Sequence, residues 1–249
     1  MGQADWHELD GVLTTASLAR GVTAGIAPPP GAGSFVFGYN SLVSDANGAH
    51  GMYVDLVGFT PTGSDPPPSA PDGGCSMRGC IKRVASANTV GFSPMLFACL
   101  QGGPPSVNDD AYILGLSDAD PYEIVLAKGP LSAGLAAAAE NMTILQRSAA
   151  QYAISGNHWH HLRLDAIVEP NGDVLLRAFA NDLALHPLGS TPTWEEIGGF
   201  TPGGFIDDAL QITSGSAPLW GGWLGWAFHV NNGLNRRGAF KALEAYRVS

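Results

Sequence analysis

The chain has 249 residues, of which 45% are hydrophobic and 14% charged, so it can bury a sizeable core within a single domain. Its 33 glycines and 18 prolines lie between alternating apolar runs, which favours an all-β chain of many short strands joined by turns. The formal net charge of -10, with only 12 Lys and Arg spread over the sequence, argues against nucleic acid as a partner.

Alternating or continuous apolar runs predict strands along most of the chain. In chain order the predicted strands cover Ser34–Tyr39, Met52–Phe59, Cys80–Val84, Met95–Gln101, Ala111–Leu116, Tyr122–Lys128, the two arms of Trp159–Asp182, Gly222–Val230 and Ala239–Arg247. The proline-rich segment Pro61–Gly74 is expected to be an extended surface loop. Leu131–Ala153 interrupts the strand pattern, and its alanine-rich centre has the strongest helix propensity of the chain. Phe205–Leu210 suits either a short helix or a strand.

The clearest of these elements is the predicted hairpin over Trp159–Asp182. One face of its first arm carries Leu162, Leu164, Ala166 and Val168, and the other face carries His161, Arg163, Asp165 and Ile167. Glu169–Asp173 supplies a turn, because proline cannot continue a ladder and Asn-Gly tolerates positive φ. The second arm begins at Val174. This pattern is typical of two antiparallel strands with one buried side.

Clusters of histidine and aspartate raise the question of metal binding. His158, His160 and His161 are the best candidates, because His158 and His160 would project to one face of a strand. No third ligand is evident, so we interpret these histidines as structural or exposed. Other candidates, for calcium, are Asp109-Asp110, Asp118 with Asp120, and Asp207-Asp208. The ordered calcium-loop pattern is absent, so we expect these aspartates to cap turns, and we expect no metal and no cofactor.

The carboxylates and serines are the candidate catalytic groups of the chain. A retaining sugar hydrolase needs two carboxylates about 5.5 Å apart on one face. The adjacent pair Glu195-Glu196 would point to opposite faces of a strand. Two pairs have i, i+2 spacing, and they are Glu8 with Asp10 near the N-terminus and Asp118 with Asp120 in a predicted turn. Because the sequence also lacks a G-x-S-x-G elbow and a phosphate-binding glycine loop, we expect no catalytic residues.

The cysteines are three in number, and the spacing of Cys75, Cys80 and Cys99 does not match a structural zinc site. A bridge between Cys75 and Cys80 is conceivable, whereas buried thiols in a reducing cytoplasm are the preferred interpretation. The sequence shows no export signal, and no run approaches the roughly 18 apolar residues of a membrane span. We therefore expect a soluble chain without membrane insertion.

Tryptophans are the strongest candidates for contact with a ligand. Trp220, Trp223 and Trp226 lie in one glycine-rich segment, where strand alternation would place Trp220 with Trp226 on one face and Trp223 on the other. An exposed indole could stack on a sugar ring or on a protein partner, but core packing is the commoner role, and we expect two of the three in the core. The candidate carbohydrate or partner contacts are Trp220, Trp223 and Trp194, the last of which lies in a predicted loop.

Several strings resemble known families. WHHLRLD, NGDVLLRAFAND, GWLGWAFHVNN and GAFKALEAYRV resemble the concanavalin A-like, laminin-G-like jelly-roll domain. More narrowly, WHELDGVLTTASLARGVTAG, FVFGYNSLVSD, SPMLFACLQG and AYILGLSDADPYEIVLAKG resemble virion proteins encoded among the structural genes of tailed bacteriophages. The likeness runs from about Asp5 to Val248. The glucanase branch of this fold carries E-x-D-x-x-E, which this sequence lacks, so the resemblance does not imply that activity.

These observations predict a two-sheet antiparallel jelly-roll β-sandwich forming one domain over residues 1–249, with residues 1–33 as a potential N-terminal extension or docking arm. The resemblance implies a non-enzymatic structural or attachment protein of a tailed-phage virion, made in the host cytoplasm and placed in the tail, baseplate or capsid surface. Its partners would be other virion proteins in a symmetric or multi-copy assembly. The alternatives are a carbohydrate-binding module that contacts host glycans and, less favoured, a glycoside hydrolase.

Overall fold

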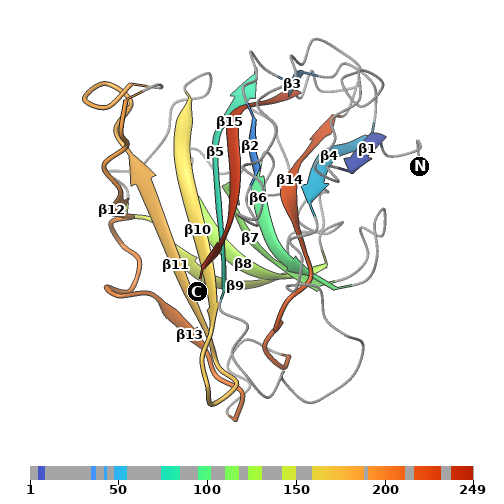
Figure 1. Cartoon of the computed structure of the whole chain (residues 1–249), viewed down its shortest axis with the longest axis vertical. Helices are drawn as coiled ribbons and strands as arrows, with labels where there is room; N and C mark the ends of the chain where they lie inside the picture. Colours follow the sequence, from blue (N-terminus) through green and yellow to red (C-terminus); the bar gives the residue numbers. More distant parts are fainter. Residues whose placement is uncertain are drawn as a thin grey trace.

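The computed structural model describes residues 5–8, 35–37, 42–43, 48–54, 74–84, 95–101, 110–117, 123–130, 142–149, 159–187, 190–210, 216–230 and 237–248. Every regular element within these ranges is a β-strand, and the strands form two sheets (Figure 1). All strand pairs are antiparallel except β1 with β4, which is parallel. The all-β, two-sheet prediction is confirmed.

One sheet has seven strands. From edge to edge they are β1 (Asp5–Glu8), β4 (Gly48–Val54), β14 (Trp223–Val230), β6 (Met95–Leu100), β7 (Asp110–Leu116), β8 (Ile124–Pro130) and β9 (Thr143–Arg147). The other sheet has eight strands. They are β12 (Glu195–Glu196), β11 (Val174–Asn181), β10 (His160–Val168), β5 (Gly74–Val84), β15 (Arg237–Val248) and β2 (Phe35–Phe37), with β13 (Phe205–Asp207) on β11 and β3 (Leu42–Val43) on β15.

The core lies between the two sheets and is built from alternate residues of their strands. The eight-stranded sheet contributes Leu162 and Leu164 of β10, which are at most 1% exposed, as the period of the first hairpin arm predicts. From the seven-stranded sheet Leu114 and Trp226 pack into the same cluster and are fully buried. Since one face of each strand faces the core, the opposite face of β10 and its neighbours is available for other roles.

The strands agree best with the sequence where the signal is local. The Trp159–Asp182 hairpin is confirmed, because β10 and β11 pair from His161 opposite Asn181 to Val168 opposite Val174. β5 begins at Gly74 and not at Cys80, so the predicted strand was too short. β9 lies in the segment expected to be irregular or helical. β13 shows that Phe205–Leu210 begins as a strand and ends in a turn.

Some predictions fall outside the described residues. These are the predicted loop over residues 61–73, the strand ends beyond residue 54 and at residues 34, 38 and 39, the alanine-rich segment 131–141 and all of the expected docking arm except β1. Among the residues described, none forms a helix with the length and hydrophobicity that a membrane span requires.

All three cysteines are buried thiols, which confirms that part of the preferred interpretation, and the alternative of a bridge between Cys75 and Cys80 is wrong. Both lie on β5, five residues apart, so their side chains point to opposite faces of the strand. At about 3.3 Å per residue their Cα atoms lie roughly 16 Å apart, far beyond the roughly 7 Å that a disulfide can span. Cys75 faces the core, whereas Cys80 pairs with His161 of β10 and lies on the outer face.

Candidate functional site

The outer face of the eight-stranded sheet carries a row of large polar and aromatic side chains. Arg163 of β10 lies opposite Arg78 of β5 on one side and opposite Phe179 of β11 on the other. Phe179 in turn pairs with Glu196 of β12. Four adjacent strands thus place two guanidinium groups, one phenyl ring and one carboxylate in a single line. Cross-strand neighbours of this kind lie within direct contact distance.

Two arginines stack on the phenyl ring of Phe179. The guanidinium carbon of Arg163 lies 4.8 Å from the ring centroid, and that of Arg177 lies 5.0 Å from it. Both distances are within the range of a favourable cation–π contact. Phe179 is only 7% exposed, so the ring is almost fully covered and the two guanidinium groups lie over it, toward the surface.

Each of these arginines also binds a carboxylate. Arg163 donates two hydrogen bonds to Asp165, from Nε at 2.7 Å and from Nη2 at 2.5 Å, in the planar paired geometry that suits guanidinium. Arg177 donates to Glu196 at 3.4 Å, and Glu196 also accepts from the backbone N–H of Gly203 at 3.1 and 3.2 Å. The carboxylates of this face therefore already have structural partners.

Trp194 lies at the other end of the face, between a histidine and an arginine. Its ring meets the His161 ring edge-on at 4.6 Å between centroids, and the guanidinium carbon of Arg78 lies 5.6 Å from its centroid. Asn181 fixes this arrangement because its side-chain nitrogen lies 3.2 Å from Nδ1 of His161 and its oxygen accepts from the backbone N–H of Thr193 at 3.0 Å. The half-buried indole is thus held on a rigid support.

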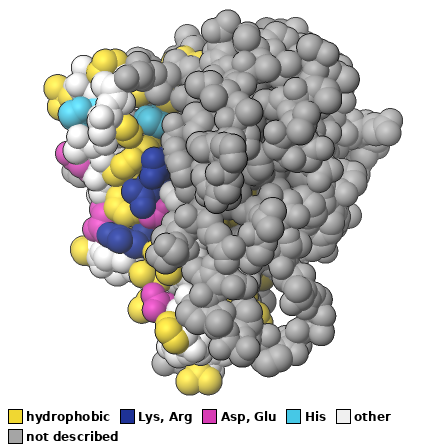
Figure 2. Space-filling view, in the orientation of Figure 1, with side chains coloured by type: hydrophobic (Ala, Val, Ile, Leu, Met, Phe, Trp, Pro, Cys, Tyr) yellow, Lys and Arg dark blue, Asp and Glu magenta, His cyan; other side chains and the backbone are white. Residues whose placement is uncertain are grey.

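This surface is the arginine–aromatic face. It comprises Arg78, His161, Arg163, Asp165, Arg177, Phe179, Trp194 and Glu196. Figure 2 shows basic side chains gathered between acidic and hydrophobic ones over this part of the molecule, with histidine above them in the view. The face offers paired hydrogen-bond donors and acceptors beside aromatic carbon, and it is built on strands. Such a surface can bind a ligand that has both hydroxyl groups and apolar C–H groups.

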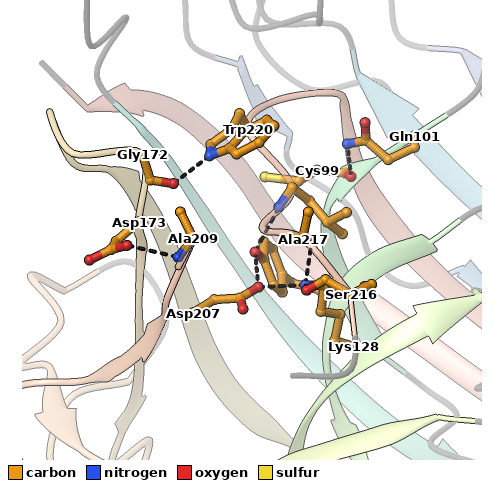
Figure 3. Close-up of polar contacts among 12 residues, drawn as sticks. Cys99, Gln101, Lys128, Gly172, Asp173, Asp207, Ala209, Ser216, Ala217 and Trp220 are labelled. Carbon is orange, nitrogen blue, oxygen red and sulfur yellow. Dashed lines mark hydrogen bonds and ion pairs between the residues drawn. The ribbon is translucent and has the colours of Figure 1, made fainter. Parts of the chain in front are cut away.

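A second polar cluster is buried between the sheets. Lys128 Nζ lies 2.7 Å from Asp207 Oδ2, and both side chains are at most 1% exposed. The same oxygen accepts from Tyr112 Oη at 2.5 Å, and Lys128 also donates to the backbone carbonyls of Ser216 and Ala217 at 2.8 and 2.7 Å (Figure 3). This buried ion-pair cluster joins β7 and β8 of one sheet to β13, which pairs with β11 of the other.

The ionisation of this cluster follows from its burial. Loss of hydration lowers the pKa of Lys128 below its usual value, and the Asp207 carboxylate acts in the opposite direction. Burial, followed by the negative charge of Asp207, raises the pKa of Tyr112 well above its usual value. The Lys128 ammonium donates three hydrogen bonds, so we assign the cluster a structural role as a clamp between the sheets.

The three tryptophans chosen from the sequence lie in different settings. Trp194 belongs to the arginine–aromatic face. Trp220 precedes β14, so strand alternation does not set its direction; it packs against the core and donates from Nε1 to the Gly172 carbonyl at 2.5 Å (Figure 3). The side chain of Trp223 is outside the described part of the chain, and Trp226 is fully buried.

Other sequence candidates are also placed by the structure. Asp207 was expected to cap a turn, but it lies in β13 and forms the buried ion pair, so that expectation is wrong. Asp208 does cap a turn, because its Oδ1 accepts from the backbone N–H of Leu210 at 2.7 Å. In the part of the chain that the structure describes, no three His, Cys, Asp or Glu side chains group as metal ligands. The candidates outside that part are His158, Asp10, Asp109, Asp118 and Asp120.

Sequence reasoning missed the arginines of the face. Arg78, Arg163 and Arg177 come from three strands, and the basic residues of the chain appear evenly spread in the linear sequence. The available signal was the outward side of the β10 pattern, which already placed Arg163 with Asp165 and His161. No local sequence pattern predicts the cross-strand register that places Arg78 and Phe179 beside Arg163.

Comparison with known proteins identifies no family. The sequence matches no protein-family model, and it matches no curated protein. Among solved structures, the chain is similar to the legume lectin-like domain from Entamoeba histolytica, with 11% identity, coverage of 87% of this chain and 90% of that chain, and a TM-score of 0.39. It is also similar to the metal-free carbohydrate recognition domain of Emp46p, with 12% identity, coverage of 70% and 71%, and a TM-score of 0.38.

A third similar structure is the CBM2 module of the evolved Dit of Lactobacillus casei BL23 phage J-1. Its identity is 10%, the coverage is 75% of this chain and 68% of that chain, and the TM-score is 0.33. At these TM-scores the likenesses say nothing about the ligand or partner of this chain.

Proposed function

We propose that this chain is a non-enzymatic glycan-binding β-sandwich module whose ligand lies on the arginine–aromatic face. The observation that carries the proposal is the line of Arg78, Arg163, Phe179 and Glu196 across four strands, with Trp194 at its end. Sugars combine hydroxyl groups with a patch of C–H groups on the ring. Paired guanidinium and carboxylate groups match the hydroxyls, and the indole matches the C–H patch.

Rigidity supports the same proposal. Arg163 is held by two hydrogen bonds to Asp165 and by the ring of Phe179, yet its side chain remains 23% exposed. Arg177 and Glu196 are held in a similar way and are 37% and 40% exposed. Side chains that are already fixed lose little conformational freedom on binding, which favours recognition of a polar ligand.

The proposal of a non-enzymatic role rests on the state of the carboxylates. A sugar hydrolase needs one carboxylic acid and one free carboxylate on opposite sides of the scissile bond. On this face Asp165 is 2% exposed and bound by Arg163, and Glu196 is bound by Arg177 and by a backbone N–H. The neighbouring Glu195 alternates to the other side of β12.

A glycan array tests this proposal with the full chain, Trp194→Ala and a control. Leu210 suits the control because it is 93% exposed and lies on the turn after β13. β13 pairs with the start of β11, whereas β12, which follows Trp194, pairs with its end. We expect the wild type and Leu210→Ala to bind the same glycans, and Trp194→Ala to lose at least about fivefold in affinity, because one sugar–aromatic stack contributes about 1–3 kcal/mol by analogy with base stacking. A wild-type chain that binds no glycan, or a Trp194→Ala variant that binds as well as the wild type, would overturn the proposal.

The cellular setting is a second part of the proposal. The resemblance of strings such as AYILGLSDADPYEIVLAKG to virion proteins of tailed phages supports a place on the virion, where glycan binding would attach the particle to its host. Mass spectrometry of purified particles from a strain that carries the gene tests this placement. The chain is expected among the particle proteins in multiple copies; its absence from particles, with presence in the cell extract, would overturn the virion role and leave the glycan proposal untouched.

A further inference from the structure

Cys99 has a backbone conformation that is unfavourable for its residue type. Its φ of +57° lies in the left-handed region, and no other non-glycine residue among the described ranges has a positive φ. Such conformations persist only where the surroundings enforce them, and they often mark a site with a particular role. The conformation of Cys99 therefore needs a structural cause.

The cause is a β-bulge between β6 and β14. Trp223 pairs with Leu100 and Gly225 pairs with Phe97, so two residues of β6, Ala98 and Cys99, lie opposite the single residue between Trp223 and Gly225. A bulge of this kind redirects a side chain. In a regular strand Ala98 and Cys99 would point to opposite faces, but both belong to the buried core cluster. The bulge thus turns the Cys99 side chain inward.

Neighbouring groups hold the bulge in place. Gln101 donates from its side-chain nitrogen to the carbonyl of Cys99 at 2.8 Å (Figure 3). The same nitrogen donates to the carbonyl of Gly221 at 2.6 Å. At Gly222, with φ of +129°, an added Cβ would meet the carbonyl oxygen of Leu100 at 2.4 Å. The bulge is therefore built from both strands of the pair, and it fixes the direction of the Cys99 thiol.

The thiol that Cys99 meets belongs to the opposite sheet. Cys75 lies on β5 of the eight-stranded sheet, is fully buried in the same core cluster as Cys99, and interacts with the Cys99 thiol. Burial, followed by this interaction, raises the pKa of Cys75 well above its usual value, so its thiol stays protonated while the fold is closed. The contact joins the two sheets across the core, and Cys80 has no part in it because it points to the outer face.

We propose that Cys75 and Cys99 form a disulfide between the two sheets when the chain folds in the presence of a disulfide oxidant of the glutathione type, and that the structure shows the reduced state of this pair. The thiolate of one cysteine attacks glutathione disulfide, and one glutathione thiolate leaves. The second cysteine thiolate then attacks the protein sulfur of the mixed disulfide, and the second glutathione leaves. Two electrons pass to glutathione, and the two protons lost by the cysteine thiols are taken up by the two glutathione thiolates.

The test is refolding of the full chain from urea with and without glutathione disulfide, followed by alkylation in denaturant and peptide mapping. Refolding matters because both thiols are inaccessible in the closed fold. With the oxidant, we expect the chain to lose the mass of two hydrogen atoms, to keep one alkylated cysteine, Cys80, and to unfold at a higher urea concentration than the reduced chain. Three alkylated cysteines, or a bridge that contains Cys80, would overturn the proposal.

Matched variants distinguish this pair from the alternatives. Cys80→Ala should still lose two hydrogen atoms, because Cys80 is outside the pair. Cys99→Gly should not, and glycine suits the positive φ at this position, so the variant is expected to fold. Cys75→Ala removes the other thiol of the pair, so this variant should also not lose two hydrogen atoms. Loss of two hydrogen atoms in either the Cys75 or the Cys99 variant would show that another pair is oxidised.

Discussion

Replacement of Asp207 by Asn is the most informative perturbation of the core. Asn keeps the size of the side chain and can still accept from Tyr112, but it removes the negative charge beside Lys128 at 2.7 Å. Lys128 would then be a buried ammonium beside a neutral amide, while the carbonyls of Ser216 and Ala217 would still accept its hydrogen bonds. Breaking one half of a buried ion pair costs about 3–5 kcal/mol, so we expect Asp207→Asn to lose about that much unfolding free energy.

A double-mutant cycle measured by urea unfolding checks the reasoning. Lys128→Met alone should cost a similar amount, because it leaves the Asp207 carboxylate buried without the Lys128 ammonium, while the Tyr112 hydroxyl group still donates to it. The double variant Lys128→Met/Asp207→Asn removes both charges and should lose less than the sum of the single losses by at least about 2 kcal/mol. Additive losses, or a loss below about 1 kcal/mol for Asp207→Asn, would refute the description of this cluster as a buried clamp.

Three further predictions concern pH, backbone and the outer face. The raised pKa of Tyr112 means that the folded chain keeps a proton that the unfolded chain releases above about pH 10. Above that pH the unfolding free energy of the wild type should fall with pH more steeply than that of Tyr112→Phe, by about 1.4 kcal/mol per pH unit. Urea unfolding at several pH values measures this difference in slope. Gly222→Ala should lower the unfolding free energy by about 2 kcal/mol or more, because its Cβ would meet a backbone oxygen at 2.4 Å. The control Gly203→Ala has nothing within 4 Å of its Cβ and should lose only the roughly 1 kcal/mol that its positive φ costs. Equal shifts in the melting temperature of the two variants would contradict this prediction. Arg163→Lys should lose about 1–2 kcal/mol of unfolding free energy, because lysine cannot both bind Asp165 with two hydrogen bonds and stack on the Phe179 ring. An unchanged midpoint of urea unfolding would contradict the description of the face as a rigid unit.

The hairpin of β10 and β11 shows what the sequence can predict. Its alternation and its Glu169–Asp173 turn are local signals, and the structure has both strands and the turn where they were expected. The first half of β5 lacks such a signal, because Gly74, Arg78 and Gly79 weaken the apolar pattern. This strand is stabilised by β10 and β15 on its two sides, and that pairing is a tertiary effect.

The two polar clusters could not be predicted for the same reason. Lys128 and Asp207 are 79 residues apart, and no local pattern relates them. Lysine and aspartate are rarely buried unless they are paired, so neither residue alone suggests a core position. On the outer face the direction of Arg163 followed from alternation, but its neighbours Arg78 and Phe179 depend on strand order and register. Local periodicity predicts which face of the strand a side chain lies on, whereas strand order and register decide which side chains of other strands lie beside it.

Calorimetric titration measures directly whether the arginine–aromatic face binds glycans. The best glycan from the array is titrated into the full chain, Trp194→Ala and Leu210→Ala under the same conditions. We predict that the Kd of Trp194→Ala rises at least about fivefold while that of Leu210→Ala stays at the wild-type value. An unchanged Kd for Trp194→Ala, with both variants folded, would place the glycan elsewhere on the molecule and contradict the claim.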